Sequence, residues 1–192
     1  IGQDIGKNFK KQDIEIDPKI MMQGIVDAMA DTSMLTDAEI QKVMMNFQVA
    51  MREKQQNKMK EASEKNKAEA EAFFAENKNK EGVITLDSGL QYKVLKSGNG
   101  KSPKLSSSVE AHYAGRLIDG TEFDSSYKRG KPQAFKVTGV IKGWTEILQL
   151  MKEGDKWEVY IPSDLAYGER GSGPTIGPNA ALIFEMELIS VN

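Results

Sequence analysis

The sequence has no cysteine and only one histidine in 192 residues. Without cysteine there can be no disulfide, no thiol nucleophile and no thiolate metal site, although the cellular compartment stays open. No apolar run approaches the ~20 residues that a membrane-spanning helix requires, so we expect no transmembrane segment. The 26 basic residues nearly balance the 28 acidic ones, and no basic block stands apart. We therefore expect no nucleic-acid partner.

The short motifs of covalent, phosphate and metal chemistry are also absent. There is no G-x-S-x-G elbow, no P-loop and no cluster of metal-ligand residues, so we expect no metal and no other cofactor. His112 falls in a segment with a strand pattern, where a histidine that faces solvent is the simplest interpretation. The glycine-rich run at residues 168–173 is followed by no helical pattern that could aim N–H groups at a phosphate. It predicts a flexible loop.

Residues 1–35 predict short helices with apolar faces. Ile1, Ile5 and Phe9 recur every four residues, and Asp17 precedes a first-turn proline as an N-cap would. A second apolar stripe follows, formed by Met21, Met22, Ile25 and Met29. Helices this short cannot build a core of their own, so these stripes require another helix or a second copy of the chain. We expect residues 1–35 to be a dimerisation region and the chain to form a homodimer.

Residues 36–80 predict one long connecting helix. Thr36 and Glu39 fit a capping box, in which each side chain satisfies a backbone N–H at the helix start. An apolar face follows, made by Ile40, Val43, Met44, Phe47 and Met51. We expect Phe73 and Phe74 to dock the far end of the helix. If the helix runs from Thr36 to about Asn77, a rise of ~1.5 Å per residue makes it a rod of roughly 60 Å.

Between residues 52 and 72 the helical pattern loses its apolar face. A disordered charged linker is one interpretation of this stretch. A solvent-exposed helix is favoured, because opposite charges recur four residues apart. The pairs are Glu61/Lys65, Lys60/Glu64, Lys65/Glu69 and Lys67/Glu71. A helix that is polar on all sides commonly bridges domains, and we expect this one to end at Glu81-Gly82.

From Val83 onward the spacing of the apolar residues changes from helical to alternating. Segments around residues 90–94, 109–115, 157–161 and 182–188 predict strands, and Asp119-Gly120 is a hairpin signal. Residues 144–151 predict the one short helix among them. The fold class is therefore α+β: a helical N-terminal arm, a long connecting helix, and an antiparallel sheet wrapped around one short helix in residues 81–192.

Four segments of the C-terminal region carry a family resemblance. AHYAGRL at 111–117, DGTEFDSS at 119–126, GVIKGW at 139–144 and AYG at 166–168 resemble the successive signatures of the FK506-binding proteins (FKBPs), in family order and spacing. This resemblance covers residues 83–192. The N-terminal portion, with IGxxIG at residues 1–6, methionine-rich helices and a long charged helix, resembles the macrophage infectivity potentiator (Mip) proteins, which are dimeric FKBPs of Gram-negative bacteria.

The resemblance implies a pocket whose floor is Trp144. Tyr167 would offer its hydroxyl to a substrate carbonyl, and Asp124 would be a buried carboxylate at the rim, held by Tyr113 and Arg129. The catalytic residues would be Tyr113, Phe123, Asp124, Trp144, Tyr167 and Phe184. The other residues of the substrate and inhibitor pocket would be Arg129, Phe135, Val140, Ile141 and Ile176.

Three positions depart from the most familiar FKBP pattern. Gln133 stands where an aromatic wall residue is common, and Ser172 and Thr175 replace larger residues of the loop beside the pocket. We therefore expect a pocket that is more open and more polar on one side. This departure bears on the affinity for inhibitors more than on activity.

The implied function is peptidyl-prolyl cis/trans isomerisation of proline-containing polypeptides, without covalent chemistry and inhibited by FK506-type and rapamycin-type macrolides. The alternative is a dimeric, chaperone-like binding module for unfolded chains, to which exposed methionines are suited. An inactive FKBP scaffold is disfavoured, because the pocket residues are all present. The resemblance also implies the periplasm or outer-membrane surface of a Gram-negative bacterium, with a link to virulence; the cytoplasm is the alternative location.

Overall fold

The computed structural model describes residues 1–192, which form two compact units, Ile1–Lys54 and Gln55–Asn192. Helix α3 (Asp37–Asn77) runs from one unit into the other. The domain boundaries expected near residues 35 and 80 stay predictions. No helix combines the length and the hydropathy that a membrane span needs.

The N-terminal unit contains α1 (Gly2–Lys11), α2 (Pro18–Met29) and the first part of α3. The expected caps are confirmed. Asp17 Oδ1 accepts a hydrogen bond from the Lys19 N–H at 2.7 Å. The Thr36 N–H donates to Glu39 Oε2 at 2.8 Å, and the Glu39 N–H donates back to Thr36 Oγ1 at 3.3 Å. Both helices therefore begin where local hydrogen bonding requires.

The apolar faces of this unit are only partly covered within the chain. No residue of Ile1–Lys54 is buried. The side chains of α1 and α2 enclose a hollow of about 690 Å³ whose apolar lining includes Ile5, Phe9 and Met21. Residues such as Ile20 and Met29 are 73% and 84% exposed. Two short helices cannot bury such stripes between them, which is the situation expected from the sequence.

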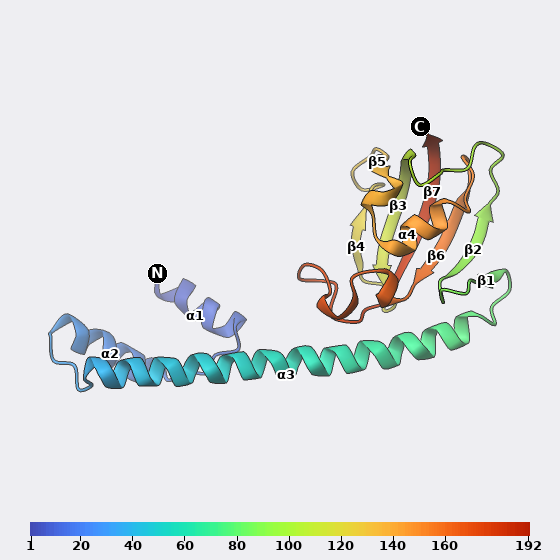
Figure 1. Ribbon diagram of the computed structural model, residues 1–192. Coiled ribbons are helices and arrows are strands. Elements are labelled where there is room, and N and C mark those ends of the chain that lie inside the picture. The colour runs from blue at the N-terminus through green and yellow to red at the C-terminus, as the bar shows by residue number, and fades with distance from the viewer. The chain divides into compact units, whose positions relative to one another are not determined.

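The C-terminal unit is built on one antiparallel sheet, with the order β1-β2-β6-β7-β3-β4 and with β5 paired to β3 (Figure 1). The strands are β1 (Val83–Thr85), β2 (Gln91–Lys96), β3 (Ser108–Leu117), β4 (Glu122–Ser125), β5 (Gln133–Lys136), β6 (Lys156–Ile161) and β7 (Leu182–Val191). Helix α4 (Lys142–Leu148) lies across one face and buries Trp144, Ile147 and Leu148 against it (Figure 1). The expected α+β class is thus confirmed.

Both boundaries of α4 differ from their prediction. α4 begins at Lys142 rather than Trp144, because extended Ile141 accepts the first helical bond from the Thr145 N–H at 3.0 Å. It ends at Leu148 rather than at residue 151, where the chain tightens into a turn. α3 ends at Asn77, and the chain turns before Glu81-Gly82 because the N–H groups of Asn79 and Lys80 bond three residues back. Such tight bonds end a helix before the sequence pattern does.

The sequence pattern predicts that the distal part of α3 is exposed on all sides. This prediction is wrong. One face is half-buried or buried within the C-terminal unit. Its members are Ala62, Ser63, Asn66, Ala70, Phe73, Phe74 and Asn77. Phe73 packs on Tyr160 with ring centroids 5.7 Å apart, so docking by this phenylalanine is confirmed. On the outer face, the expected pairs Lys60–Glu64 and Lys65–Glu69 form at 3.9 and 3.8 Å.

Two buried amides join the end of α3 to the sheet. Asn77 is 1% exposed, and its Nδ2 donates to Gln91 Oε1 at 2.9 Å. The Gln91 Nε2 in turn donates to the Phe74 carbonyl at 3.0 Å. The helix end is therefore held by hydrogen bonds that have no access to water, where an unmade bond is costly.

We expect Asn77→Ala to lower the free energy of unfolding of the C-terminal unit by about 1–3 kcal/mol, because the Gln91 carbonyl would stay buried without a donor. Urea denaturation followed by tryptophan fluorescence measures this unit alone, since both tryptophans, Trp144 and Trp157, lie within it. Asn99→Ala, the same change at an exposed position, is the control and should cost less than about 0.5 kcal/mol. Equal losses in the two variants would contradict this role for Asn77.

Candidate active site

A cavity of about 670 Å³ opens between the sheet, α4 and the loop that precedes β7. Its lining is mainly aromatic and aliphatic. The lining residues are Tyr113, Phe123, Asp124, Phe135, Gly139, Val140, Ile141, Trp144, Tyr167, Ser172, Gly173, Pro174, Thr175, Ile176 and Phe184. All the residues expected in the pocket from the sequence line this cavity except Arg129. Arg129 instead bonds to two lining residues, Asp124 and Tyr113.

Trp144 is the centre of the aromatic packing. Its ring centroid lies 5.2 Å from that of Tyr113, 5.1 Å from Phe135 and 5.2 Å from Phe184, each pair meeting edge to face. Phe123 extends the cluster, 5.6 Å from Phe184. Edge-to-face pairs of this kind are favourable beyond the area that they bury. The indole is only 4% exposed, so the floor of the cavity is also core.

Gly115 on β3 allows two rings to reach this position. A Cβ at residue 115 would lie 2.6 Å from the Phe123 ring and 2.7 Å from that of Phe184. These separations are far below a van der Waals contact. Gly115 pairs with Phe184 across β3 and β7, so the Phe184 ring folds over the glycine toward the cavity. A larger residue here would push the walls into the cavity.

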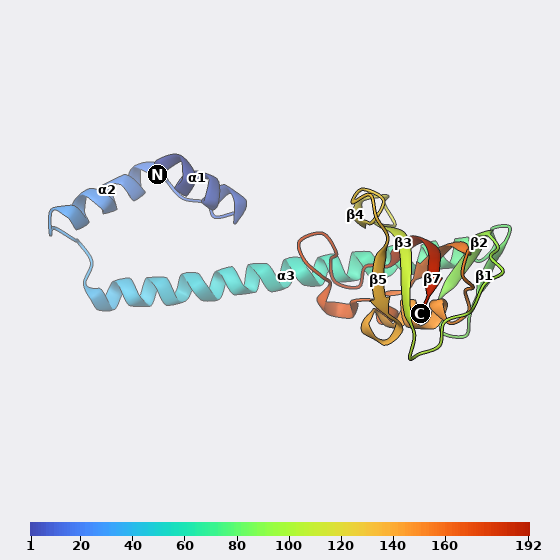
Figure 2. The ribbon, with the colours of Figure 1, turned by 90° about the horizontal axis from the view of Figure 1, so that it is seen from above.

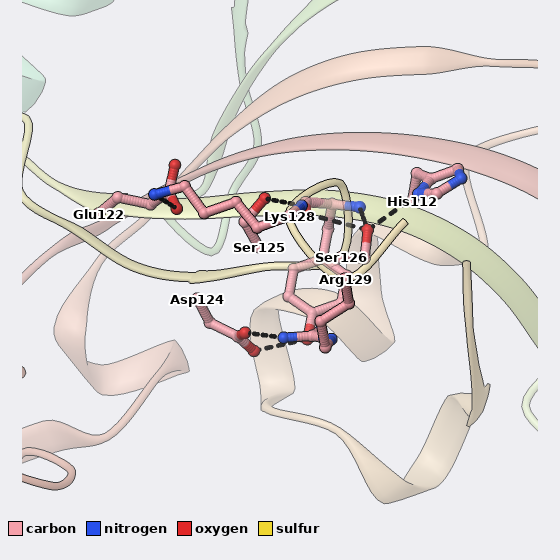
Figure 3. A network of polar contacts seen from close by, with 8 residues as sticks. His112, Glu122, Asp124, Ser125, Ser126, Lys128 and Arg129 are labelled. Carbon is pink, nitrogen blue, oxygen red and sulfur yellow. Dashed lines mark hydrogen bonds and ion pairs between the residues drawn. The ribbon is translucent and has the colours of Figure 1, made fainter. Parts of the chain in front are cut away.

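The polar side of the cavity is a network of Asp124, Tyr113 and Arg129. Figure 3 shows its Asp124–Arg129 pair. The Tyr113 hydroxyl donates to Asp124 Oδ2 at 2.5 Å. Arg129 donates to Asp124 Oδ1, and through its other nitrogen to the Tyr113 hydroxyl at 2.7 Å. Both carboxylate oxygens are therefore occupied by donors within the protein.

Asp124 is not the buried carboxylate expected from the sequence, since its side chain is 41% exposed on β4, at one edge of the sheet. Partial burial by itself would raise the pKa of this carboxyl, but the hydrogen bonds from Tyr113 and Arg129 outweigh it and hold the pKa below its usual value. Burial, and then the bond to Asp124, raises the pKa of the Tyr113 phenol. Near neutral pH the pair is a carboxylate with a neutral phenol donor.

His112 does not line the cavity and instead contacts Ser126 and Tyr127. Its Nδ1 lies 3.0 Å from Ser126 Oγ (Figure 3), and its ring stacks on Tyr127 with centroids 4.7 Å apart. The imidazole is half-buried, so the expectation of a histidine that simply faces solvent is wrong. The hydroxyl of Ser126 also accepts the Tyr113 N–H at 2.7 Å. His112 thus supports the turn beside Tyr113 from behind.

The glycine-rich run begins a hydrogen-bonded loop. The Ser172 N–H donates to the Ile176 carbonyl at 2.8 Å, and the Ile176 N–H donates back at 3.2 Å. Gly171 has a φ of +64°, and a Cβ there would lie 2.2 Å from the Ile176 carbonyl oxygen, so only glycine fits. Ser172 and Thr175 line the cavity, whereas Gln133 does not and is exposed on β5.

Sequence reasoning did not place Gly139, Gly173 and Pro174 in the cavity lining. None of them carries a functional group, and all three reach the cavity through loop geometry. The chemistry available to the whole lining is correspondingly limited. It offers one ionised carboxylate, hydroxyl groups and a large apolar surface, and it contains no paired nucleophile and base.

Comparison with known proteins identifies the family of the chain. The family described as FKBP-type peptidyl-prolyl cis-trans isomerase matches residues 99–189, and the domain that stands amino-terminal to such isomerases matches residues 1–94. This chain belongs to the FKBP family. It is an FKBP-type peptidyl-prolyl cis-trans isomerase, an enzyme that acts on proline-containing chains.

Similar proteins cover this FKBP from end to end. The outer membrane protein MIP of Legionella longbeachae is 48% identical over 192 residues, which is 100% of this chain and 82% of the relative. The peptidyl-prolyl cis-trans isomerase Mip of Coxiella burnetii is 50% identical over 187 residues, covering 97% of this chain and 81% of its own length. The crystal structure of FkpA from Escherichia coli matches with a TM-score of 0.86 at 39% identity, over 100% of this chain and 91% of that one.

The depressed pKa of Asp124 gives a pH dependence of stability. The folded-state pKa lies below the ordinary value of 3.8, so the carboxylate stabilises the fold above that pH, and the contribution is lost as the pH falls through the folded-state pKa. We expect the wild type to be more stable than Asp124→Asn at pH 7, with a difference that shrinks below about pH 4. Urea denaturation at a series of pH values measures it.

Asp164→Asn, at an exposed aspartate outside the cavity, is the matched control and should show little difference at any pH. A gap between the wild type and Asp124→Asn that widens on acidification would contradict the assignment, because it would require a folded-state pKa above the unfolded one.

Proposed function

We propose that the aromatic cavity is the catalytic site of this isomerase, and that it accelerates rotation about X–Pro bonds without forming a covalent intermediate. The observation that carries the proposal is the packing of Trp144 with Tyr113, Phe135 and Phe184, which makes the floor of a 670 Å³ cavity almost entirely aromatic. A proline ring is compact and apolar and suits such a floor.

The physics of the reaction explains why such a cavity suffices. Rotation about the C–N bond must break amide resonance, a barrier of ~18–20 kcal/mol, so free X–Pro bonds isomerise in tens to hundreds of seconds. The planar amide is strongly dipolar, and water solvates it well. In the twisted transition state the carbonyl loses its share of the nitrogen lone pair and becomes less polar. A site with little water therefore favours the twisted amide over the planar one.

The demand on the site is modest. Raising a rate of about 10⁻² s⁻¹ to a typical kcat of ~10–10³ s⁻¹ requires roughly 4–7 kcal/mol of preferential binding to the transition state. Apolar packing around the proline and one or two hydrogen bonds to its neighbouring carbonyls can supply this amount. No proton needs to move.

Each polar group has a role in this scheme. Tyr167, 39% exposed at the cavity, is the donor that we assign to the substrate carbonyl. Asp124 has both oxygens occupied by Tyr113 and Arg129, so it fixes the local charge and the Tyr113 ring rather than taking a proton. Arg129 supports both from behind. We propose that macrolides of the FK506 and rapamycin type bind in this same cavity.

We expect Tyr167→Phe to lower kcat/KM for a peptide with one X–Pro bond roughly 2- to 10-fold, because one hydrogen bond is lost, and Asp124→Ala to lower it as well.

An FK506-type macrolide should inhibit the wild type. The rate should be nearly flat between pH 6 and 8, because no group of the cavity acts as a base in the neutral range. A protease-coupled or fluorescence assay of cis/trans exchange measures these rates.

Tyr127→Phe removes a hydroxyl outside the cavity and is the matched control, and His112→Ala should also have little effect. A rate that follows a sigmoid near pH 6.5 and loses it in His112→Ala would overturn the mechanism. A folded wild type with only the uncatalysed rate would overturn the proposal as a whole.

We also propose that the N-terminal unit forms a homodimer. Its support is the set of exposed apolar residues of α2 and the start of α3, together with the hollow of about 690 Å³ between α1 and α2. A patch of this kind normally marks an interface, and a two-fold dimer is the commonest closed arrangement. A second copy of the same helices supplies an apolar surface of the same chemistry.

Light scattering should find a dimer for the full chain and a monomer for the variant Ile5→Glu, since the charge would enter the apolar lining. Lys7→Glu, at an exposed position of the same helix, should stay dimeric. A fragment of residues 55–192 should be a monomer that keeps activity on a short peptide. It should be less effective than the dimer in proline-limited refolding of a whole protein, because two linked sites raise the effective concentration.

A monomeric full chain would leave a second use for the same surface, a chaperone-like grip on unfolded segments. The exposure of Met22, Met29, Met34 and Met45 favours adaptable contacts of that kind. In that case Ile5→Glu should lose the suppression of aggregation of an unfolded client and leave the mass of the protein unchanged.

We propose a location in the periplasm or at the outer surface of a Gram-negative cell, with the cytoplasm as the alternative. The support is the outer membrane protein MIP of Legionella longbeachae, which aligns with 100% of this chain.

A further inference from the structure

One wall of the cavity is the loop of residues 167–179, whose one side chain in the hydrophobic core cluster is that of Ile176. Residues 167–176 supply six of the lining residues: Tyr167, Ser172, Gly173, Pro174, Thr175 and Ile176. Only Ile176 among them is buried. The bonds between Ser172 and Ile176 fix the internal shape of this turn. They do not fix its position relative to the floor of the cavity.

The loop is tied instead to helix α3, which it adjoins in both views (Figures 1 and 2). Asn66 Nδ2 donates to the Pro178 carbonyl at 2.8 Å. Asn179 Nδ2 donates to Ser63 Oγ at 2.7 Å. Ser63 and Asn66 stand three residues apart, so one face of the helix makes both bonds to consecutive residues of the loop.

The local backbone is adapted to these two bonds. A Cβ at residue 177 would lie 3.0 Å from Asn66 Nδ2, so Gly177 leaves room for the amide to approach. Asn179 has a φ of +55°, a conformation that asparagine and glycine tolerate better than other residues. Its own N–H donates to the Gly168 carbonyl at 2.8 Å, which closes the base of the loop.

The helix is itself held to the sheet further along, at Phe73 and Asn77. Phe73 packs on Tyr160, and buried Asn77 bonds to Gln91 of β2. A continuous set of contacts therefore runs from the sheet through α3 to the loop and so to the cavity wall. Neither Ser63 nor Asn66 lines the cavity.

We propose that Ser63 and Asn66 are positioning residues, which hold the loop of residues 167–179 over the cavity and thereby set the affinity for the substrate. The inference rests on the proposed catalytic role of the cavity. Because neither residue reaches the reacting bond, its loss should weaken binding and leave the chemical step nearly unchanged. If α3 only stabilised the fold, variants at Ser63 and Asn66 that stay folded would keep the wild-type KM and kcat.

The test uses the full chain and three variants that break these bonds with little change of shape. Asn66→Asp replaces the donor beside the Pro178 carbonyl with an oxygen. Asn179→Gly keeps the positive φ and removes the side chain, and Ser63→Ala removes its acceptor. For a peptide with one X–Pro bond, we expect KM to rise roughly 3- to 10-fold while kcat changes less than about twofold.

Three comparisons make the result specific. Asn57→Asp, the same change at an exposed residue of α3, should leave KM unchanged. Ser63→Thr, which keeps the hydroxyl, should preserve the wild-type KM. The double variant Ser63→Ala with Asn179→Gly should be no worse than either single one, because both remove the same bond. Hydrogen exchange of the Ser172 and Ile176 N–H groups should quicken while that of β6 and β7 stays slow.

An unchanged KM in Asn66→Asp, or an increase equal to that in Asn57→Asp, would overturn this inference and leave the catalytic role of the cavity standing. If Tyr167→Phe and Asp124→Ala both kept full activity, the proposed function would fail instead. Faster hydrogen exchange in the loop of the Ser63, Asn66 or Asn179 variants, with KM unchanged, would show that α3 steadies the loop without any effect on substrate binding.

Discussion

The edge-to-face packing of the Trp144 indole is the contact on which both the core and the cavity of the C-terminal unit depend. Tyr113 comes from β3, Phe135 from β5 and Phe184 from β7, so three strands converge on a side chain of α4. The same contacts hold the helix on the sheet and give the cavity its floor. Because Gly115 lies opposite Phe184 in the register, the rings can close over the strand without a clash.

Several elements were predictable because their signals are local. Alternation of apolar residues gives the faces of β3, β6 and β7, since side chains on a strand alternate with period two. The capping box of Thr36 and Glu39 marks a helix start through bonds between near neighbours. The aromatic lining was predictable because Tyr113, Trp144 and Tyr167 lie within the motifs that resemble those of the FKBPs. Their positions in the motifs do not determine which of them act in catalysis.

The remainder depends on contacts between distant parts of the chain. The inner face of α3 is made of alanine, serine and asparagine residues such as Ala62, Ser63 and Asn66, and small or polar side chains leave no hydrophobic period to detect. Asp124 was expected to be buried, but its place on the edge strand β4 leaves it partly open to solvent. The bonds from Asn66 and Asn179 join positions 112 and 116 residues apart in the sequence. No local pattern encodes them.

The division of the cavity between core and loop bears on how the enzyme can change during evolution. A substitution at Trp144 or Phe184 disturbs the packing that keeps the unit folded, so selection for stability opposes any drift of the floor. Ser172, Pro174 and Thr175 lie outside the core, and the loop that carries them is closed by backbone bonds that most side chains would leave intact. Gly173 is less free to change, because its φ of +59° is one that other residues rarely adopt. On the proposed catalytic role of the cavity, changes of substrate preference should therefore arise at Ser172, Pro174 and Thr175, beside a floor that stays the same.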